Sequence, residues 1–175
     1  MIDRTDMNIG LLKSLSTLLT TKSLTQISVN EICKETGLSR RTFYNYFSSK
    51  EDFLKNSIFI FLDDVTKILY TDLSFSTPVI VEVLTYLQKN QDITRALALH
   101  YPDNLPLIKE YVADIALCSE KINKQKLKEA YQLPENFALN VYVISIISVV
   151  FVWIRTGFHE SPEEIATYIK AAVKL

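Results

Sequence analysis

Apolar side chains recur with the period of an α-helix along most of this 175-residue chain. The first such stripe predicts a helix over residues 6–21 and comprises Leu11, Leu12, Leu15, Leu18 and Leu19. Further helices are predicted over residues 28–37, 39–47, 48–72, 78–89, 92–100, 105–128, 135–156 and 161–173. A break in the 105–128 segment near residues 122–124 is left open, so about nine helices and no strand are expected.

Residues that start and stop helices stand at the ends of these segments. Ser28 and Glu31 have the spacing of a capping box, in which each side chain bonds to the backbone amide of the other residue. Gly37 suits the left-handed position that ends many helices. The capping-box spacing recurs at two later helix starts, Ser48 with Glu51 and Ser161 with Glu164.

The composition supports an all-α protein. Only three glycines and five prolines occur, too few for a turn-rich β fold. Cys33 and Cys118 lie far apart and lack the spacing of a metal site, so no disulfide framework, metal or cofactor is expected. The N-terminus lacks the sections of a signal peptide, which makes a cytoplasmic location the expectation.

The short helix predicted over residues 39–47 has two different faces. Phe43 and Phe47 are four residues apart, so they share one face and can pack onto the first helix. Arg40, Arg41, Tyr44 and Asn45 occupy the opposite face, and these residue types bind base edges and phosphates. Together with the preceding helix and the turn at Gly37, the segment has the pattern of a helix-turn-helix. An ordinary amphipathic surface helix shows the same separation.

The charge distribution agrees with contact to DNA near the N-terminus. Residues 1–57 contain eight Lys and Arg against six Asp and Glu, whereas the rest of the chain contains eleven against fourteen. The segment 38–50 has three basic residues and no acidic one. Such a patch suits a duplex backbone, although a solvated surface can have the same composition.

Residues 27–54 carry a more specific pattern. They contain EICKETG, then LS, TFYNYF and SKEDFL in this order. This run resembles the DNA-binding domain of the TetR/AcrR family of bacterial transcriptional regulators. The resemblance implies a three-helix helix-turn-helix domain over residues 1–50 and a helical regulatory and dimerisation domain over residues 51–175.

The resemblance also implies which residues touch DNA. Thr42 and Tyr44 match positions that usually do so, and Lys50 matches a lysine that binds phosphate at a helix N-terminus. Arg40 and Arg41 occupy variable positions, so we expect them to read sequence. The full expected set is Ser28, Asn30, Ser39, Arg40, Arg41, Thr42, Tyr44, Asn45, Tyr46 and Lys50.

The last two helices are implied to form the dimer interface. The apolar segment 137–154 is long enough to be considered as a membrane span. An interface helix is the preferred interpretation, because an amphipathic helix follows this segment and a buried dimer interface needs an apolar helix surface. The expected interface residues are Val141, Ile144, Ser148, Phe151, Ile165, Tyr168, Ile169 and Ala172.

The middle helices enclose a ligand cavity in this family. Here the expected lining combines apolar walls with polar tips and comprises Tyr86, Leu97, His100, Tyr101, Ile108, Tyr111 and Ile115. A filled core whose tyrosine hydroxyls bond locally is the alternative, and no ligand can be named from these residues.

The expected function is that of a DNA-binding regulator, commonly a repressor, which binds a near-palindromic operator as a dimer. A small-molecule effector is expected to modulate it. A co-regulator-dependent activator, or a helical protein-binding module without DNA affinity, is the alternative. No catalytic triad, metal-ligand set or phosphate loop is visible around the two histidines, so an enzyme is not expected.

Overall fold

The computed structural model describes residues 4–22, 26–99, 105–119 and 122–174. These residues form ten helices and no strand. In chain order the helices are α1 (Arg4–Leu19), α2 (Val29–Thr36), α3 (Arg40–Tyr46), α4 (Lys50–Leu69), α5 (Thr77–Lys89), α6 (Gln91–Leu99), α7 (Leu105–Cys118), α8 (Lys124–Tyr131), α9 (Glu135–Thr156) and α10 (Pro162–Ala172). The prediction of an all-α fold is confirmed.

The helix count differs from the prediction because the 105–128 segment forms two helices. α7 ends at Cys118 and α8 begins at Lys124. The Asn123 side chain accepts a hydrogen bond of 2.9 Å from the backbone amide of Lys126, so it caps α8. The break that the sequence left open is therefore present, and it starts a new helix.

Two of the three predicted capping boxes form as expected. The Ser28–Glu31 and Ser161–Glu164 pairs bond reciprocally at the starts of α2 and α10. The Ser48–Glu51 prediction is wrong by one residue, because Ser49 caps α4 by accepting from the amide of Asp52. The Asp52 carboxylate instead accepts from the amide and hydroxyl of Ser48 at 2.8 and 2.9 Å.

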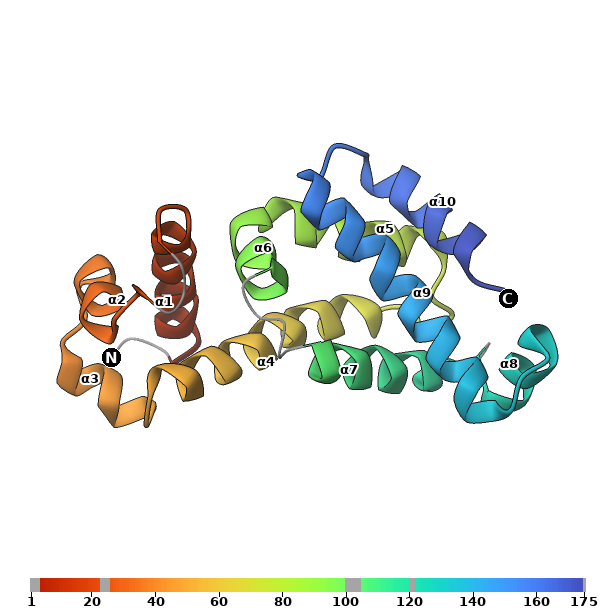
Figure 1. Cartoon of the computed structure of the whole chain (residues 1–175), viewed down its shortest axis with the longest axis horizontal. Coiled ribbons are helices and arrows are strands. Elements are labelled where there is room, and N and C mark those ends of the chain that lie inside the picture. The colour runs from red at the N-terminus through yellow and green to blue at the C-terminus, as the bar shows by residue number, and fades with distance from the viewer. Residues whose placement is uncertain (1–3, 23–25, 100–104, 120–121, 175) are drawn as a thin grey trace.

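Helices α1, α2 and α3 group at one end of the molecule, and α4 runs from this group towards the other helices (Figure 1). We call the group formed by α1–α3 and the first turn of α4 the reading head. Its core joins Leu11 and Leu15 of α1 to Ile32 of α2, Phe43 of α3 and Phe53 of α4. Gly37 ends α2 at φ 72°, a left-handed conformation that a residue without Cβ adopts readily.

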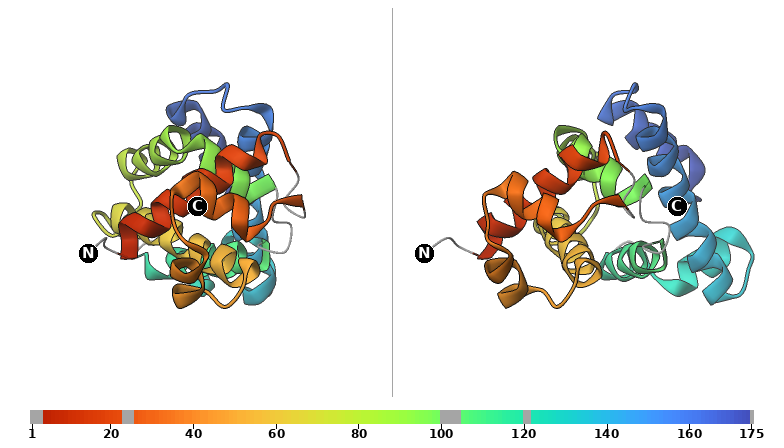
Figure 2. Two further views of the ribbon diagram at one scale, coloured as in Figure 1. Left: turned by 90° about the vertical axis from the view of Figure 1, so that its left-hand side faces the viewer. Right: turned by 60° about the vertical axis from the view of Figure 1, so that its left-hand side comes forward.

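The remaining helices form the body: α5, α6 and α10 lie on one side of α4 and α7 lies on the other, while α9 runs obliquely from α10 to α7 and α8 (Figures 1 and 2). Trp153 of α9 is the largest fully buried side chain, and its indole donates to the carbonyl of Glu160 at 2.9 Å. It packs with Leu84 of α5 and Ile165 of α10. These contacts hold α10 against α5 and α9.

Helix α6 bridges the reading head and the body. Ala96 belongs to the core of the reading head, while Ala98 packs against the cluster around Trp153. Between them, Leu97 is buried with Leu12 of α1 and Ile58 of α4. The head therefore contacts the body through α6 as well as through α4.

Helix α9 is, within the described ranges, the one helix long and apolar enough to cross a membrane. Only 28% of its most apolar window is buried inside the chain. Length and composition alone are weak support for a span, because core helices of soluble proteins meet the same test. α9 packs against α6, α7, α8 and α10, and its outer side carries the exposed side chains of Phe137, Val141, Ile144 and Val152.

Candidate DNA interface

Three phenylalanine rings fix α3 to the reading head. Phe43 is 0% exposed, and its ring centroid lies 5.3 Å from that of Phe47 and 5.6 Å from that of Phe53. Phe47 and Phe53 are 5.2 Å apart, so the three rings contact one another. Aromatic pairs at these distances add to the energy of burial. The predicted anchoring role of Phe43 and Phe47 is thus confirmed.

The opposite face of α3 is exposed and basic. Arg40, Arg41 and Asn45 are exposed, and the Tyr44 ring is 46% exposed. The guanidinium carbon of Arg40 lies 5.8 Å from the centroid of the Tyr44 ring, a cation–π distance. Tyr44 in turn contacts Phe43 edge-on, with centroids 5.4 Å apart. Arg40 is therefore held in position through Tyr44 by the buried anchor of the helix.

Two predicted contact residues at the start of α3 bond to each other. The Ser39 hydroxyl accepts from the amide of Thr42 at 3.0 Å, and the two hydroxyl oxygens are 2.8 Å apart. Ser39 is exposed and Thr42 is half-buried. These groups start the helix, so the structure assigns Ser39 the role of an N-cap beside any contact with DNA.

The start of α2 is organised in a similar way. The amide and hydroxyl of Ser28 both donate to the Glu31 carboxylate at 2.9 Å, and Lys22 forms an ion pair with the same group. The bond from Lys22, followed by those from Ser28, lowers the pKa of Glu31 to about 2. Asn30, the other residue expected here, is exposed on the first turn.

Lys50 lies at the beginning of α4 and connects it to the loop before α2. Its ammonium group donates to the carbonyl of Ile27 at 2.9 Å, and the residue is half-buried. Tyr46, at the end of α3, is 43% exposed. The Lys50 bond thus joins the start of α4 to the segment before α2, and the turn at Gly37 joins α2 to α3, which is the connectivity of a helix-turn-helix.

Comparisons with known proteins agree with this geometry. The sequence profile of bacterial regulatory proteins of the tetR family matches residues 11–56. A second profile, of the C-terminal region of transcriptional regulators, matches residues 76–174, more than half of the chain. The chain belongs to the TetR family. It is a DNA-binding transcriptional regulator by fold and domain composition.

Two solved structures have the same fold as this TetR-family regulator. A TetR transcriptional regulator from Streptococcus agalactiae is 19% identical, with a TM-score of 0.67 and coverage of 97% of this chain and 94% of that chain. The dihydroxyacetone kinase operon activator DhaS is 20% identical, with a TM-score of 0.64 and coverage of 94% and 92%. No curated protein matches the chain by sequence.

The expected cavity residues of the regulator lie in several places. The Tyr86 hydroxyl donates to Asp64 at 3.0 Å, and that of Tyr111 bonds to the Leu62 carbonyl and to Thr66. Burial, followed by the bond to Asp64, raises the pKa of Tyr86. Leu97 is in a buried cluster, and Ile115 packs against Val65 and Leu69. Ile108 is half-buried. His100 and Tyr101 lie outside the described residues.

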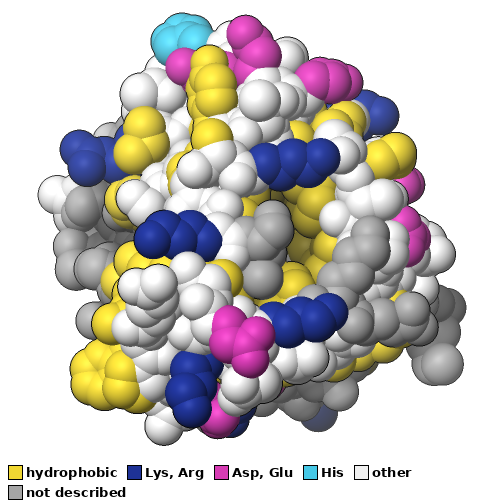
Figure 3. Space-filling view, turned by 90° about the vertical axis from the view of Figure 1, so that its right-hand side faces the viewer, with side chains coloured by type: hydrophobic (Ala, Val, Ile, Leu, Met, Phe, Trp, Pro, Cys, Tyr) yellow, Lys and Arg dark blue, Asp and Glu magenta, His cyan; other side chains and the backbone are white. Residues whose placement is uncertain are grey.

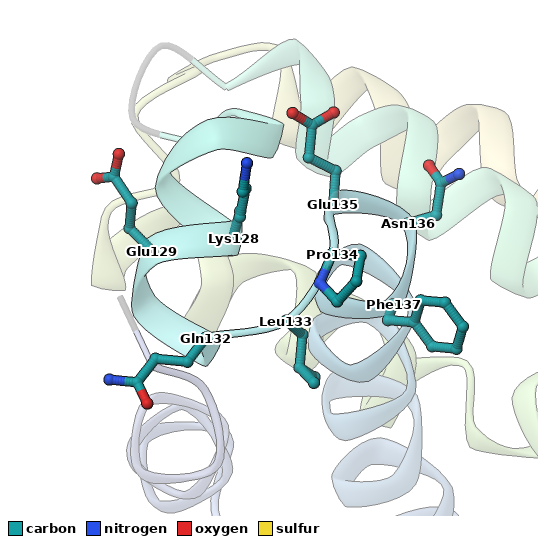
Figure 4. Close-up of a pocket in the computed structure, with 8 residues that line it drawn as sticks. All are labelled: Lys128, Glu129, Gln132, Leu133, Pro134, Glu135, Asn136 and Phe137. Carbon is teal, nitrogen blue, oxygen red and sulfur yellow. The ribbon is translucent and has the colours of Figure 1, made fainter.

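These positions agree with the filled-core alternative in the part of the chain that the structure describes. Both tyrosine hydroxyls bond to α4, and the apolar members pack into separate clusters. A groove of about 310 Å³ between α4 and α7 takes in only Tyr111 of the expected set. A larger hollow of about 740 Å³ lies at the α8–α9 turn and contains none of them (Figure 4). Its lining comprises Lys128, Glu129, Gln132, Leu133, Pro134, Glu135, Asn136 and Phe137.

The expected interface residues divide into an exposed and a buried group. The outer face of α9 contains Val141, Ile144 and Ser148, which are exposed, and Phe151, which is half-buried. On α10, Tyr168 and Ala172 are exposed. Ile165 is 2% exposed and Ile169 packs beside it, so both serve the core of the protomer around Trp153. Ile165 was expected in the dimer interface, but it is buried inside the protomer instead.

Sequence reasoning missed two large side chains on the outer face of α9. Phe137 is 66% exposed and Val152 is 55% exposed. Phe137 precedes Val141 by four residues, and Val152 follows Ser148 by four, so the helical spacing itself contained the signal. Apolar side chains also lie exposed among scattered charges at the end of the molecule formed by α8 and α10 (Figure 3).

Proposed function

We propose that this TetR-family regulator is a cytoplasmic homodimer that binds a near-palindromic operator with its two α3 helices in successive major grooves. The half-sites then lie roughly 34–36 Å apart. The division of α3 carries the proposal: Phe43 is buried on one face while Arg40, Arg41 and Asn45 are exposed on the other. A helix in the major groove needs one anchored and one polar face.

The proposed contacts divide by chemistry. Lys50 and Tyr46, together with Ser28 and Asn30 at the start of α2, are assigned to phosphates, which position the protein without reading sequence. Base edges are assigned to the exposed face of α3, since Arg binds guanine and Asn binds adenine in bidentate fashion. That group comprises Arg40, Arg41, Thr42, Tyr44 and Asn45, and Ser39 caps the helix that presents it.

The proposed dimer uses the outer face of α9 together with α10. Phe137, Val141, Ile144 and Val152 are apolar and exposed on one side of α9. Pairing two such faces removes a contiguous apolar surface from water, which is the driving force of most protein association. We propose the domain boundary at residue 50, the first residue of α4, although the first turn of this helix still packs against α3 through Phe53.

Repression relieved by a small molecule is the first proposal for control. The alternative is an activator that responds to a protein co-regulator, and one observation favours it: the tyrosines expected to line a cavity bond to α4. DhaS, which has the same fold, is an operon activator by name. Both alternatives use the same contacts with DNA.

A selection of binding sites from random duplexes by the purified full-length protein tests the proposal. We expect an enriched, near-palindromic sequence whose half-sites have the spacing of one helical turn or slightly more. The same experiment reports DNA binding, operator sequence and half-site spacing together. Enrichment of no sequence at moderate salt, where non-specific binding to phosphates is weakened, contradicts the assignment of α3 as a reading helix.

The Arg41→Ala substitution separates base reading from phosphate contact. If Arg41 reads a base, its loss costs about 1–3 kcal/mol of operator affinity and relaxes preference at one position of each half-site. Titration of operator and single-base variants at fixed salt measures both effects. Arg95→Ala is the matched control, because Arg95 is exposed on α6. An equal loss on all sequences assigns Arg41 to phosphate instead.

A further inference from the structure

The two arginines at the start of α3 differ in what supports them. Arg40 lies four residues before Tyr44, so the two side chains share one face of the helix. The guanidinium carbon of Arg40 is 5.8 Å from the centroid of the Tyr44 ring, within the range of a cation–π interaction. That ring contacts the fully buried Phe43 edge-on at 5.4 Å. Tyr44 therefore lies between the rigid anchor of the helix and a flexible, exposed cation.

The charge of Arg40 also acts on α2. Burial raises the pKa of the Cys33 thiol of α2, and the charge of Arg40 opposes this rise. Because such an effect falls with distance, the guanidinium lies near α2 as well as near the Tyr44 ring. Within the described residues, none of the N–H donors of Arg40 forms a hydrogen bond or an ion pair. The group is thus held on its aromatic side while its donors stay available for DNA.

Arg41 provides the comparison inside the same helix. It is exposed like Arg40, but it forms no cation–π contact, hydrogen bond or ion pair with the residues that the structure describes. An unsupported arginine loses its rotational freedom only when it binds, whereas a supported one has lost part of it beforehand. Arg40 is therefore the better preorganised of the two for contact with a base.

We propose that Tyr44 is a positioning residue, which holds Arg40 for bidentate contact with one guanine in each half-site and makes Arg40 the determinant of sequence at that base pair. The planar fork of guanidinium donors matches the O6 and N7 atoms of guanine, and contact with an aromatic ring leaves such a fork open. The inference rests on the proposed function and refines it, because Tyr44 then acts on DNA through Arg40.

The contact itself is tested by NMR of the full-length protein without DNA. The ring current of Tyr44 should displace the δ-methylene and Nε–H resonances of Arg40, but not those of Arg41. Tyr44→Phe keeps a ring and should retain this displacement. Tyr44→Leu keeps an apolar side chain against Phe43 and should remove it. Arg40 resonances that stay in place in Tyr44→Leu overturn the inference, whether or not the protein binds an operator.

Operator titrations at fixed salt test the effect on specificity. Arg40→Ala first identifies the base pair at which preference for guanine is lost, and the affinity ratio between guanine and the other bases should fall there about tenfold or more. Tyr44→Leu should lower the same ratio about three- to tenfold. Tyr44→Phe should retain the ratio, since any phosphate contact of the lost hydroxyl affects all sequences equally.

A double-mutant cycle separates positioning from a direct contact between Tyr44 and a base. In the Arg40→Ala background, Tyr44→Leu should change the ratio at this base pair by less than about twofold, because the side chain that it positions is absent. Arg41→Ala with Tyr44→Leu is the matched pair, and its two effects on operator affinity should be additive.

Two results on an operator that the wild type binds overturn the role of Tyr44 alone. One is additivity of Arg40→Ala and Tyr44→Leu in the guanine ratio, and the other is an equal loss of that ratio in Tyr44→Phe and Tyr44→Leu. A wild-type protein that selects no operator overturns the proposed function and this role together.

Discussion

Phe43→Ala is expected to lower the free energy of unfolding by about 3–5 kcal/mol and to abolish operator binding. The ring is fully buried and contacts both Phe47 and Phe53, so its removal leaves a cavity in the middle of the reading head. The same change removes the support of Tyr44, against which Arg40 is held. Urea unfolding at one protein concentration measures the stability, and titration with the selected operator measures the binding.

Phe59→Ala is the matched control for the stability measurement. It removes the same side chain from α4, but at a position that is half exposed, so we expect a much smaller loss. A change of less than about 1 kcal/mol for Phe43→Ala contradicts the role of this ring as the anchor of α3.

Ile144→Asp is expected to dissociate the proposed dimer. Ile144 lies in the middle of the exposed apolar face of α9, beside Val141 and Ser148. In the dimer, the two substituted copies place two unpaired carboxylates in the interface, and each uncompensated charge costs several kcal/mol. The dimer dissociation constant should rise at least about 100-fold, and operator affinity should fall because only one head then binds. Sedimentation equilibrium in detergent-free buffer measures the assembly.

Thr17→Asp provides the control for added charge, since Thr17 is exposed on α1, away from α9. The assembly of this variant should equal that of the wild type. A wild-type protein that sediments as a monomer at micromolar concentration, or an Ile144→Asp variant that remains dimeric, refutes the proposed dimer interface. Partition of the wild type into lipid vesicles supports a membrane role for α9 instead.

Local sequence signals predicted the reading head well because its helix ends depend on neighbouring residues. Ser28, Gly37 and Ser39 act on groups within about four positions of themselves, so their roles follow from spacing. The start of α4 was misplaced because adjacent serines and acids, at 48–49 and 51–52, offer two registers. Tertiary packing selects between them, since Phe53 must meet Phe43 and Phe47.

The protein core and the dimer interface were predicted less well, because helical spacing shows which residues share a face but not what that face packs against. Ile165 and Tyr168 are three residues apart on α10, yet Ile165 packs under Trp153 while Tyr168 is exposed. Similarly, the composition of α4 and α7 allows either a cavity or a filled core. The hydroxyl bonds of Tyr86 and Tyr111 to α4 favour the filled core in the described residues, and no local pattern specifies them.

Helix α6 has a consequence for how the protein unfolds. One of its alanines lies in the core of the head and another against the cluster of α9, with Leu97 buried between them. Opening the head thus exposes apolar surface on α6 that also supports the body. Protection of backbone amides from hydrogen exchange should therefore not fall to a separate, lower level in α1 and α2, and the chain should melt as one cooperative unit despite its elongated connection through α4.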